Sequence, residues 1–218
     1  MKKRINLLQI LIHLGGGAPS VVLLYRYLTN NLTANPIQAL EQQTGLTALI
    51  FLMLSLACSP LGAIFDWKNL SKQKKALGVY GFIYAAIHLL LFIGLDYGFN
   101  FIRILRDVSN KIYVLFGLTA FLLLLPLAVT SFRYFKKLLG KNWKRLHRLV
   151  YIISPIVIVH FFLVFKGNLA RLQGNIIKPS IYGALVLLLL ILRIPVVKRA
   201  LILFRIRIQE RLRKTYPL

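Results

Sequence analysis

Acidic side chains are scarce in this sequence. Its 218 residues include five aspartates and glutamates against 29 lysines and arginines, which gives a formal net charge of +24 at pH 7. With 58% hydrophobic residues and a mean hydropathy of +0.70, a water-soluble domain of this composition would not stay in solution. The sequence therefore indicates an integral membrane protein. A basic surface can bind nucleic acid, but here the basic residues lie between apolar runs, so we expect membrane lipids and no nucleic acid as partners.

The sequence has a single cysteine and no carboxylate inside an apolar run. The single cysteine, Cys58, lies in an apolar run, which excludes an internal disulfide and a site with several thiolate ligands. We expect it to be a small packing residue. No acidic residue falls inside any apolar run. Pumps and transporters usually need carboxylates or charge pairs within the membrane, so this absence argues against both.

Six apolar runs have the length of a membrane span. Each is close to the roughly 20 residues that a helix rising about 1.5 Å per residue needs to cross about 30 Å of hydrocarbon. The runs are Ile5 to Leu28, Leu46 to Ile64, Leu77 to Leu95, Ile112 to Val129, Val150 to Phe165, and Ile181 to Val197, the last interrupted by Arg193. The first run resembles a signal peptide, but its apolar character continues beyond Ser20, so we expect an uncleaved span. The predicted fold is an all-α bundle of six transmembrane helices.

The lysines and arginines predict the orientation, because positive loops stay on the cytoplasmic side. The N-terminus, the loops 68–75 and 133–148, and the tail from Arg193 hold 22 of the 29 basic residues. Both termini are therefore expected in the cytoplasm, and the loop from Thr29 to Gly45, which lacks lysine and arginine, is expected outside. Asn35 and Pro36 are suited to starting a short surface helix there. We divide the chain into a transmembrane domain, residues 1–197, and a basic amphipathic tail, residues 198–218, on the anionic inner leaflet; a disordered tail is the alternative.

Four histidines are the candidates for chemistry inside the membrane. Ionisable side chains are costly in hydrocarbon, so His13, His88, His147 and His160 are functional candidates. His88 and His160 lie about 15 and 18 Å from the inner boundaries of their spans. Two helices could clamp one haem iron between these imidazoles, and filling both axial positions favours electron transfer over oxygen chemistry. Hydrogen bonding to a neighbouring helix, with no ligand bound, is the alternative role for either residue.

The other two histidines are predicted to have different roles. His147 precedes His160 by thirteen residues, about 20 Å along a helix and about 140° around it, so the two cannot share one straight face. That separation suits a second redox centre, while the neighbouring basic residues suit contact with a haem propionate, a flavin phosphate or a lipid phosphate. His13, about 14 Å deep, is either a ligand or a donor that supports one, or it packs without a cofactor.

Short motifs along nearly the whole chain carry a family resemblance. They are His13 with Pro19, Asn35-Pro36, Thr44-Gly45 with Thr47-Ala48-Leu49, Ser59-Pro60-Leu61, Leu77-Gly78 before His88, Pro126-Leu127-Ala128 with Thr130-Ser131, Leu139-Gly140 with Trp143, Leu146-His147, Val150-Tyr151, His160 and Ile181-Tyr182-Gly183. Single motifs are weak, but their order and spacing together are specific. On them the chain resembles the MsrQ (YedZ) family, haem-binding membrane subunits of the bacterial periplasmic methionine sulfoxide reductase system, within the ferric reductase-like transmembrane group.

The resemblance implies a six-helix subunit of the bacterial inner membrane that binds haem b, with flavin mononucleotide (FMN) also associated with the family. It implies an electron-transfer subunit rather than a complete enzyme. Electrons would pass from a cytoplasmic flavin reductase or quinone to a periplasmic molybdopterin partner of the MsrP type, which repairs oxidised methionine. The family's histidines fall on His88, His147 and His160.

One departure limits the resemblance. In the wider oxidase and ferric reductase pattern, two helices carry two histidines each. Here position 74, fourteen residues before His88, is Lys74, which argues against a symmetric stack of two haems. No flavin motif is legible. A ferric or other metal reductase on the same scaffold, with a different acceptor, is the redox alternative. A transporter or membrane scaffold whose histidines only pack is the non-redox alternative.

Overall fold

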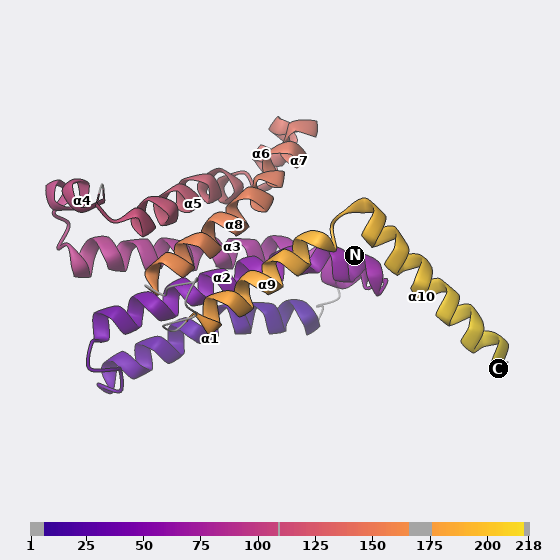
Figure 1. Cartoon of the computed structure of the whole chain (residues 1–218), viewed down its shortest axis with the longest axis horizontal. Helices are drawn as coiled ribbons and strands as arrows, with labels where there is room; N and C mark the ends of the chain where they lie inside the picture. Colours follow the sequence, from indigo (N-terminus) through magenta and orange to yellow (C-terminus); the bar gives the residue numbers. More distant parts are fainter. Residues whose placement is uncertain (1–6, 109, 166–175, 216–218) are drawn as a thin grey trace.

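The computed structural model describes residues 7–108, 110–165 and 176–215, and within these ranges it contains helices and turns but no strand (Figure 1). The membrane-protein class predicted from composition is therefore matched by an all-helical chain. The elements are α1 (Leu7–Leu28), α2 (Pro36–Ile64), α3 (Lys68–Leu91), the π-helical segment η1 (Phe92–Asp96), α4 (Phe101–Val108), α5 (Ile112–Val129), α6 (Arg133–Leu139), α7 (Lys141–Leu146), the 3-10 segment η2 (His147–Leu149), α8 (Val150–Val164), α9 (Ile177–Ile191) and α10 (Pro195–Thr215).

Five of the six predicted spans are confirmed as long apolar helices. They are α1, α2, α3 with η1, α5, and the stretch Lys141–Val164 that contains α8. The run from Ile181 to Val197 is not one straight helix, which corrects that prediction. It breaks after Ile191, and α9 and α10 meet at 81°, so a sixth span is counted only if this bent pair is taken as one. Pro195 explains the break, because proline cannot continue the hydrogen bonding of a preceding helix.

Arg193 fixes the bend between α9 and α10. Its guanidinium donates hydrogen bonds to the backbone carbonyl oxygen of Leu56 in α2, at 2.5 Å, and to the hydroxyl of Tyr151 in α8, at 2.6 Å. The charge that interrupts the sixth apolar run is thus held by carbonyl and phenol oxygens instead of facing hydrocarbon. The domain boundary predicted at residue 197 remains a prediction, although the helix that continues into the tail already begins at Pro195.

The start of α2 corrects the prediction of an outer loop that ends at Gly45. Asn35 caps the helix, because its side chain accepts a hydrogen bond from the backbone N–H of Gln38 at 3.1 Å, and Pro36 occupies the first turn. The expected short surface helix is therefore the first part of α2 itself. Hydropathy marked only the apolar part of this helix, so Glu41 lies inside a candidate span and not in a loop.

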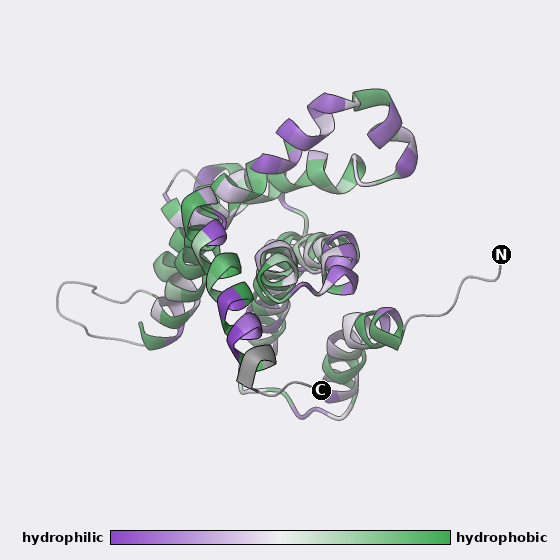
Figure 2. Cartoon of the chain, turned by 90° about the vertical axis from the view of Figure 1, so that its right-hand side faces the viewer, coloured by the Kyte–Doolittle hydropathy of each residue, from purple (hydrophilic) through white to green (hydrophobic). Residues whose placement is uncertain are grey.

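Successive long helices run in opposite directions, so the connections between them gather at the two ends of the bundle, on the left and right of Figure 1. We call one the basic end; it contains the α2–α3 turn, α6, α7 and the bend after α9. The opposite cap end contains residues 29–35, η1 and α4. Figure 2, which views the molecule from the basic end, shows hydrophilic residues on α6 and α7 and mostly hydrophobic residues along the bundle. The start of α1 and the α9–α10 bend lie at the same end, as an even number of crossings requires.

The core surrounds α2, the central helix. Leu52 packs with Leu124 and Ile153 in one buried cluster, and Leu49 packs with Ile158 and Val186 in another. Cys58 is buried and unpaired, which confirms its predicted packing role. These contacts hold α5, α8 and α9 against α2, and Cys58 packs with Leu77 and Tyr84 of α3. The candidate site lies among α2, α3, α5 and α8.

Candidate functional site

His88 and His160 lie side by side, as predicted for a pair on two different helices. His88 is three residues before the end of α3, and His160 is four residues before the end of α8, so both lie toward the cap end. Their ring centres are 6.3 Å apart and the ring planes are inclined at 75°. The bundle therefore brings together two residues that are 72 positions apart in the sequence.

Each ring is fixed by a backbone carbonyl of the neighbouring helix. The Nδ1 atom of His88 is 2.9 Å from the carbonyl oxygen of Glu41 in α2. The Nδ1 atom of His160 is 2.7 Å from the carbonyl oxygen of Tyr113 in α5. A carbonyl oxygen can only accept a hydrogen bond, so both Nδ1 atoms carry the proton and both Nε2 atoms keep a lone pair. This is the arrangement of metal-binding imidazoles, in which the second ring nitrogen is hydrogen-bonded to set the tautomer and the ring orientation.

A cavity of about 690 Å³ lies between α2, α3, α5 and α8 and includes both rings in its lining. Apolar side chains make most of its wall, among them Leu49, Leu52, Phe92, Phe121, Val157 and Phe161. Polar side chains lie along its rim at the cap end: Asn35, Gln38, Glu41, Asp96 and Lys178. A volume of this size suits a large flat apolar ligand with a polar edge.

Two glycines beside the rings were not predicted as site residues. A Cβ atom on Gly45 would be 3.2 Å from Cε1 and Nδ1 of His88, and one on Gly117 would be 2.8 Å from Cε1 of His160. The sequence does contain a signal that would have found them. The tetrapeptide Gly-Leu-Thr-Ala occurs at 45–48 and again at 117–120, and each glycine precedes its histidine by the same 43 residues.

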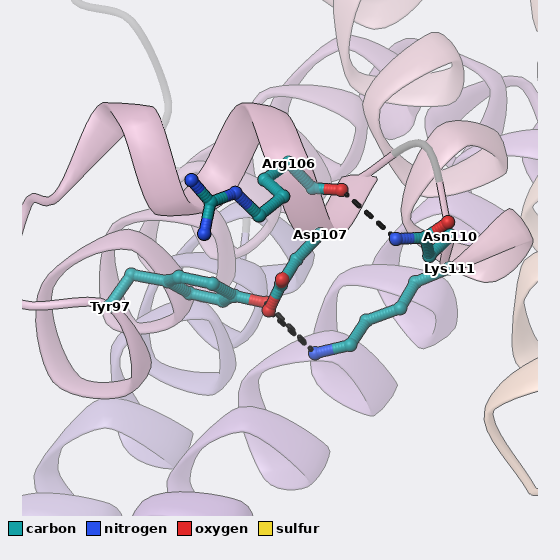
Figure 3. Close-up of polar contacts among 5 residues, drawn as sticks. All are labelled: Tyr97, Arg106, Asp107, Asn110 and Lys111. Carbon is teal, nitrogen blue, oxygen red and sulfur yellow. Dashed lines mark hydrogen bonds and ion pairs between the residues drawn. The ribbon is translucent and has the colours of Figure 1, made fainter.

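A polar cluster joins α4 to the residues on either side of it, Tyr97 after η1 and Lys111 before α5 (Figure 3). The buried Tyr97 receives a hydrogen bond from Nζ of Lys111 at 2.9 Å and donates one to Oδ2 of Asp107 at 3.1 Å. Lys111 also lies 3.5 Å from the same carboxylate oxygen. Because Ile104 and Val108 of α4 line the cavity, the cluster holds one wall of the site in place.

His147 lies at the basic end, in the 3-10 segment η2, and does not line the cavity. Its ring lies against Trp143, with ring centres 4.1 Å apart and ring planes inclined at 32°. Its Nε2 is 3.2 Å from the hydroxyl of Thr130, which donates its own hydrogen to the carbonyl oxygen of Pro126 at 2.6 Å. Nε2 therefore donates to Thr130, and Nδ1 carries the lone pair. The structure does not bring His147 to the other two histidines.

His13 is also apart from the pair. Its Nδ1 is 3.0 Å from the hydroxyl of Tyr80, and its ring meets the Tyr80 ring edge-on at 5.9 Å. It lines neither this cavity nor the shallower groove between α1, α2 and α3. The neighbouring Gly16 is buried, and Tyr84 donates to its carbonyl oxygen at 2.8 Å. His13 and Gly16 thus hold α1 against α3.

The paired histidines fit a metal inside a macrocycle better than a bare metal ion. Among the described residues, no group of three or more His, Cys, Asp or Glu side chains could hold a metal ion. Two imidazoles alone suit an iron whose other four ligands come from a porphyrin. A metal clamped between them would separate the ring centres by about 6 Å, allowing about 2 Å for each metal–nitrogen bond and about 1 Å more to each ring centre. The observed separation of 6.3 Å agrees.

Comparison with known proteins gives consistent matches. Residues 42–158 match the family described as ferric reductase like transmembrane component. A protein-methionine-sulfoxide reductase heme-binding subunit MsrQ from Rhodospirillum rubrum is 38% identical over 176 residues, 80% of this chain and 81% of that protein. The subunit of the same name from Herminiimonas arsenicoxydans is 37% identical over 168 residues, 77% and 75% of the two chains. That from Caulobacter vibrioides is 34% identical over 185 residues, 84% and 85%.

Proposed function

Because the chain belongs to the MsrQ family of ferric reductase-like membrane proteins, we propose that it holds haem b between His88 and His160 and carries electrons across the bacterial inner membrane to a methionine sulfoxide reductase. The observation that carries the proposal is the pair of imidazoles 6.3 Å apart, each fixed through Nδ1 by a backbone carbonyl. Their Nε2 lone pairs would bind the haem iron. His147 stays a predicted ligand or phosphate contact for a second cofactor.

The residues around the pair have separate tasks. Haem iron, when bound, takes up and releases one electron at a time. The carbonyls of Glu41 and Tyr113 hold the rings and raise the basicity of Nε2 through their hydrogen bonds. Two imidazoles bound to the iron would leave oxygen no open coordination site, a ligand set that favours electron transfer. The apolar wall keeps water away, and Lys178 and the amides of Asn35 and Gln38 in the polar rim would donate hydrogen bonds to the propionates of a porphyrin.

The direction of transfer follows from charge and position. The basic end carries the lysines and arginines of α3, α6, α7 and α10, so we assign it to the cytoplasm under the positive-inside rule. The pair then lies nearer the periplasm, where a molybdopterin reductase of the MsrP type, the acceptor implied by the resemblance, would receive the electrons. The donor is a cytoplasmic flavin reductase or a quinone.

The resemblance also implies FMN. No residue in the described ranges is assigned to a flavin, and no step of the proposal passes through one. His147 with Trp143 and the neighbouring lysines at the basic end is the place where an anionic cofactor or lipid phosphate would find positive charge.

We also propose that α10 lies on the inner leaflet. Leu201, Phe204, Ile208 and Leu212 recur every three or four residues, while Lys198, Arg199, Arg205, Arg207 and Arg211 occupy other positions of the helix. A bend of 81° turns this helix away from the direction of α9, so a spanning α9 leaves α10 nearly parallel to the membrane surface.

The test is single-turnover oxidation of the reduced protein. The purified protein, reduced with dithionite in the absence of oxygen, should lose its b-type α band when an oxidised periplasmic methionine sulfoxide reductase is added. Loss of the band only with ferric chelates would instead support a ferric reductase. Absence of any b-type spectrum in the purified protein would support the transporter or scaffold and contradict the proposal.

A further inference from the structure

The two halves of the site repeat each other. In α2 and α3, the carbonyl of Glu41 contacts a histidine 47 residues later, and in α5 and α8 the carbonyl of Tyr113 does the same. In both halves a glycine stands four residues after the carbonyl-bearing residue, at Gly45 and at Gly117. The same unit of carbonyl, glycine and histidine therefore occurs twice, 72 residues apart, and the two copies face each other across the cavity.

Helix geometry explains why a glycine belongs at that position. In an α-helix the carbonyl of residue i points toward the N–H of residue i+4, and the side chains at i and i+4 lie on one face. A Cβ atom at i+4 therefore stands beside the carbonyl oxygen and blocks a ring that approaches it from a neighbouring helix. Glycine leaves the carbonyl free to accept a second hydrogen bond, here from the imidazole.

The distances show that the two glycine positions differ in how well they would accept a Cβ atom. A Cβ on Gly117 would lie 2.8 Å from Cε1 and 2.9 Å from Nδ1 of His160, well inside the contact distance of about 3.5 Å. A Cβ on Gly45 would lie 3.2 Å from the matching atoms of His88, so a small movement of that ring would admit it. In both cases the obstructed atoms belong to the imidazole ring itself.

We propose that Gly45 and Gly117 are positioning residues that set the orientation of the two axial imidazoles, an inference that rests on the proposed haem ligation. Neither glycine ligates the metal. Each lets its ring dock on the carbonyl four residues earlier, which directs Nε2 toward the centre of the cavity. A methyl group at either position would displace the imidazole ring and so change the ligand field at the iron.

The experiment compares four alanine variants of the full-length protein. Gly45→Ala and Gly117→Ala are the test variants. Gly78→Ala is the crowding control, because its Cβ would also meet an atom at 3.2 Å, but that atom is Oγ of Ser55 and not a ring atom. Gly17→Ala is the open-space control, since nothing lies within 4 Å of a Cβ there. The measurements are haem per chain, the electron paramagnetic resonance spectrum of the oxidised protein, and the midpoint potential.

We expect Gly117→Ala to lose more than half of its haem or to show a high-spin signal. Gly45→Ala should keep its haem with shifted low-spin resonances and a shifted potential, and both controls should match the wild type in spectrum and potential. Each test variant tests one half of the site. If Gly45→Ala has the haem content, resonances and midpoint potential of the wild type, the proposal is overturned for α2. The same result in Gly117→Ala overturns it for α5. If Gly117→Ala does not accumulate, His160→Gly alone and His160→Gly combined with Gly117→Ala are compared, both supplied with imidazole. We expect imidazole to restore the low-spin spectrum less well in the double variant, and equal recovery in the two overturns the proposal for α5.

The outcome is separable from that of the proposed function. If His88→Ala or His160→Ala retains haem with an unchanged spectrum, the ligand assignment itself is wrong. If those variants lose haem while both glycine variants match the wild type, the ligands stand and only the positioning role fails.

Discussion

The imidazole rings of His88 and His160 lie 6.3 Å apart and are inclined at 75°. Neither ring needs the other to hold this position, because each Nδ1 is bound to a carbonyl on a different helix. The site is therefore preorganised by two independent helix pairs, α2 with α3 and α5 with α8. Preorganisation of this kind limits the rearrangement that accompanies a change in the charge of a bound metal, which suits a group that transfers electrons.

The Tyr97 hydroxyl should contribute to stability without affecting the cofactor. Tyr97→Phe removes a buried hydroxyl that both donates and accepts, so we expect a loss of about 1 kcal/mol in the free energy of unfolding. Thermal unfolding in detergent measures it, with Phe101→Ala as an exposed control on the same cap. Tyr97 does not line the cavity, so the haem spectrum should not change. Equal melting temperatures for the variant and the wild type would contradict this role.

The contribution of Lys111 should disappear at high pH. The hydrogen bond to the Tyr97 hydroxyl is the main cause that raises the pKa of Lys111 above its ordinary value. A raised pKa means that the folded state favours the charged amine, so the stabilisation is complete below about 10.4, the ordinary lysine value, and is lost as pH rises through the folded value. The difference in melting temperature between wild type and Lys111→Gln should stay constant to pH 9 and shrink above about 10.4. A difference that persists unchanged at pH 11.5 would refute the coupling.

The orientation can be measured with single cysteines. Cys58 is buried, so Cys58→Ser provides a background without an accessible thiol. In that background Thr33→Cys, at the cap end, should react with a membrane-impermeant maleimide in intact spheroplasts. Lys144→Cys, at the basic end, should react only after permeabilisation. The reverse pattern would place the basic end in the periplasm.

Replacing His147 should leave the haem of the pair in place. His147 is engaged with Thr130 and Trp143 and lies outside the cavity, so His147→Ala should retain at least one haem per chain with unchanged low-spin character. If the wild type holds two haems per chain and the variant holds one, the second haem is assigned to His147. Complete loss of haem would mean that His147 belongs to the main site.

Hydropathy predicted the class of fold well because it is a property of whole segments. The bounds of α5 were predicted to the residue, since its apolar run ends where its helix ends. Hydropathy failed at α2, where a cap at Asn35 starts the helix ten residues before the apolar run. It also failed at the last span, where one proline and one hydrogen-bonded arginine turn the helix by 81°.

Some features of the site could also be predicted from the sequence and others could not. The search for ionisable residues inside apolar runs made His88 and His160 candidates, and depth along the helix suggested that they meet, as the structure shows. Depth alone also included His13, because it gives no information on which side of the bundle a helix packs. The supporting carbonyls could not be predicted, since every residue carries one. The two glycines could have been, from the Gly-Leu-Thr-Ala repeat at a constant distance from each histidine.

The measurement that tests the account most directly is the ratio of haem to protein, with the reduced optical spectrum, after each histidine is replaced in turn by alanine. His88→Ala and His160→Ala should each fall below about a tenth of the wild-type ratio and lose the low-spin b-type bands, because each removes one axial ligand. His13→Ala should match the wild type. A full haem complement with an unchanged spectrum in either His88→Ala or His160→Ala would contradict the central claim.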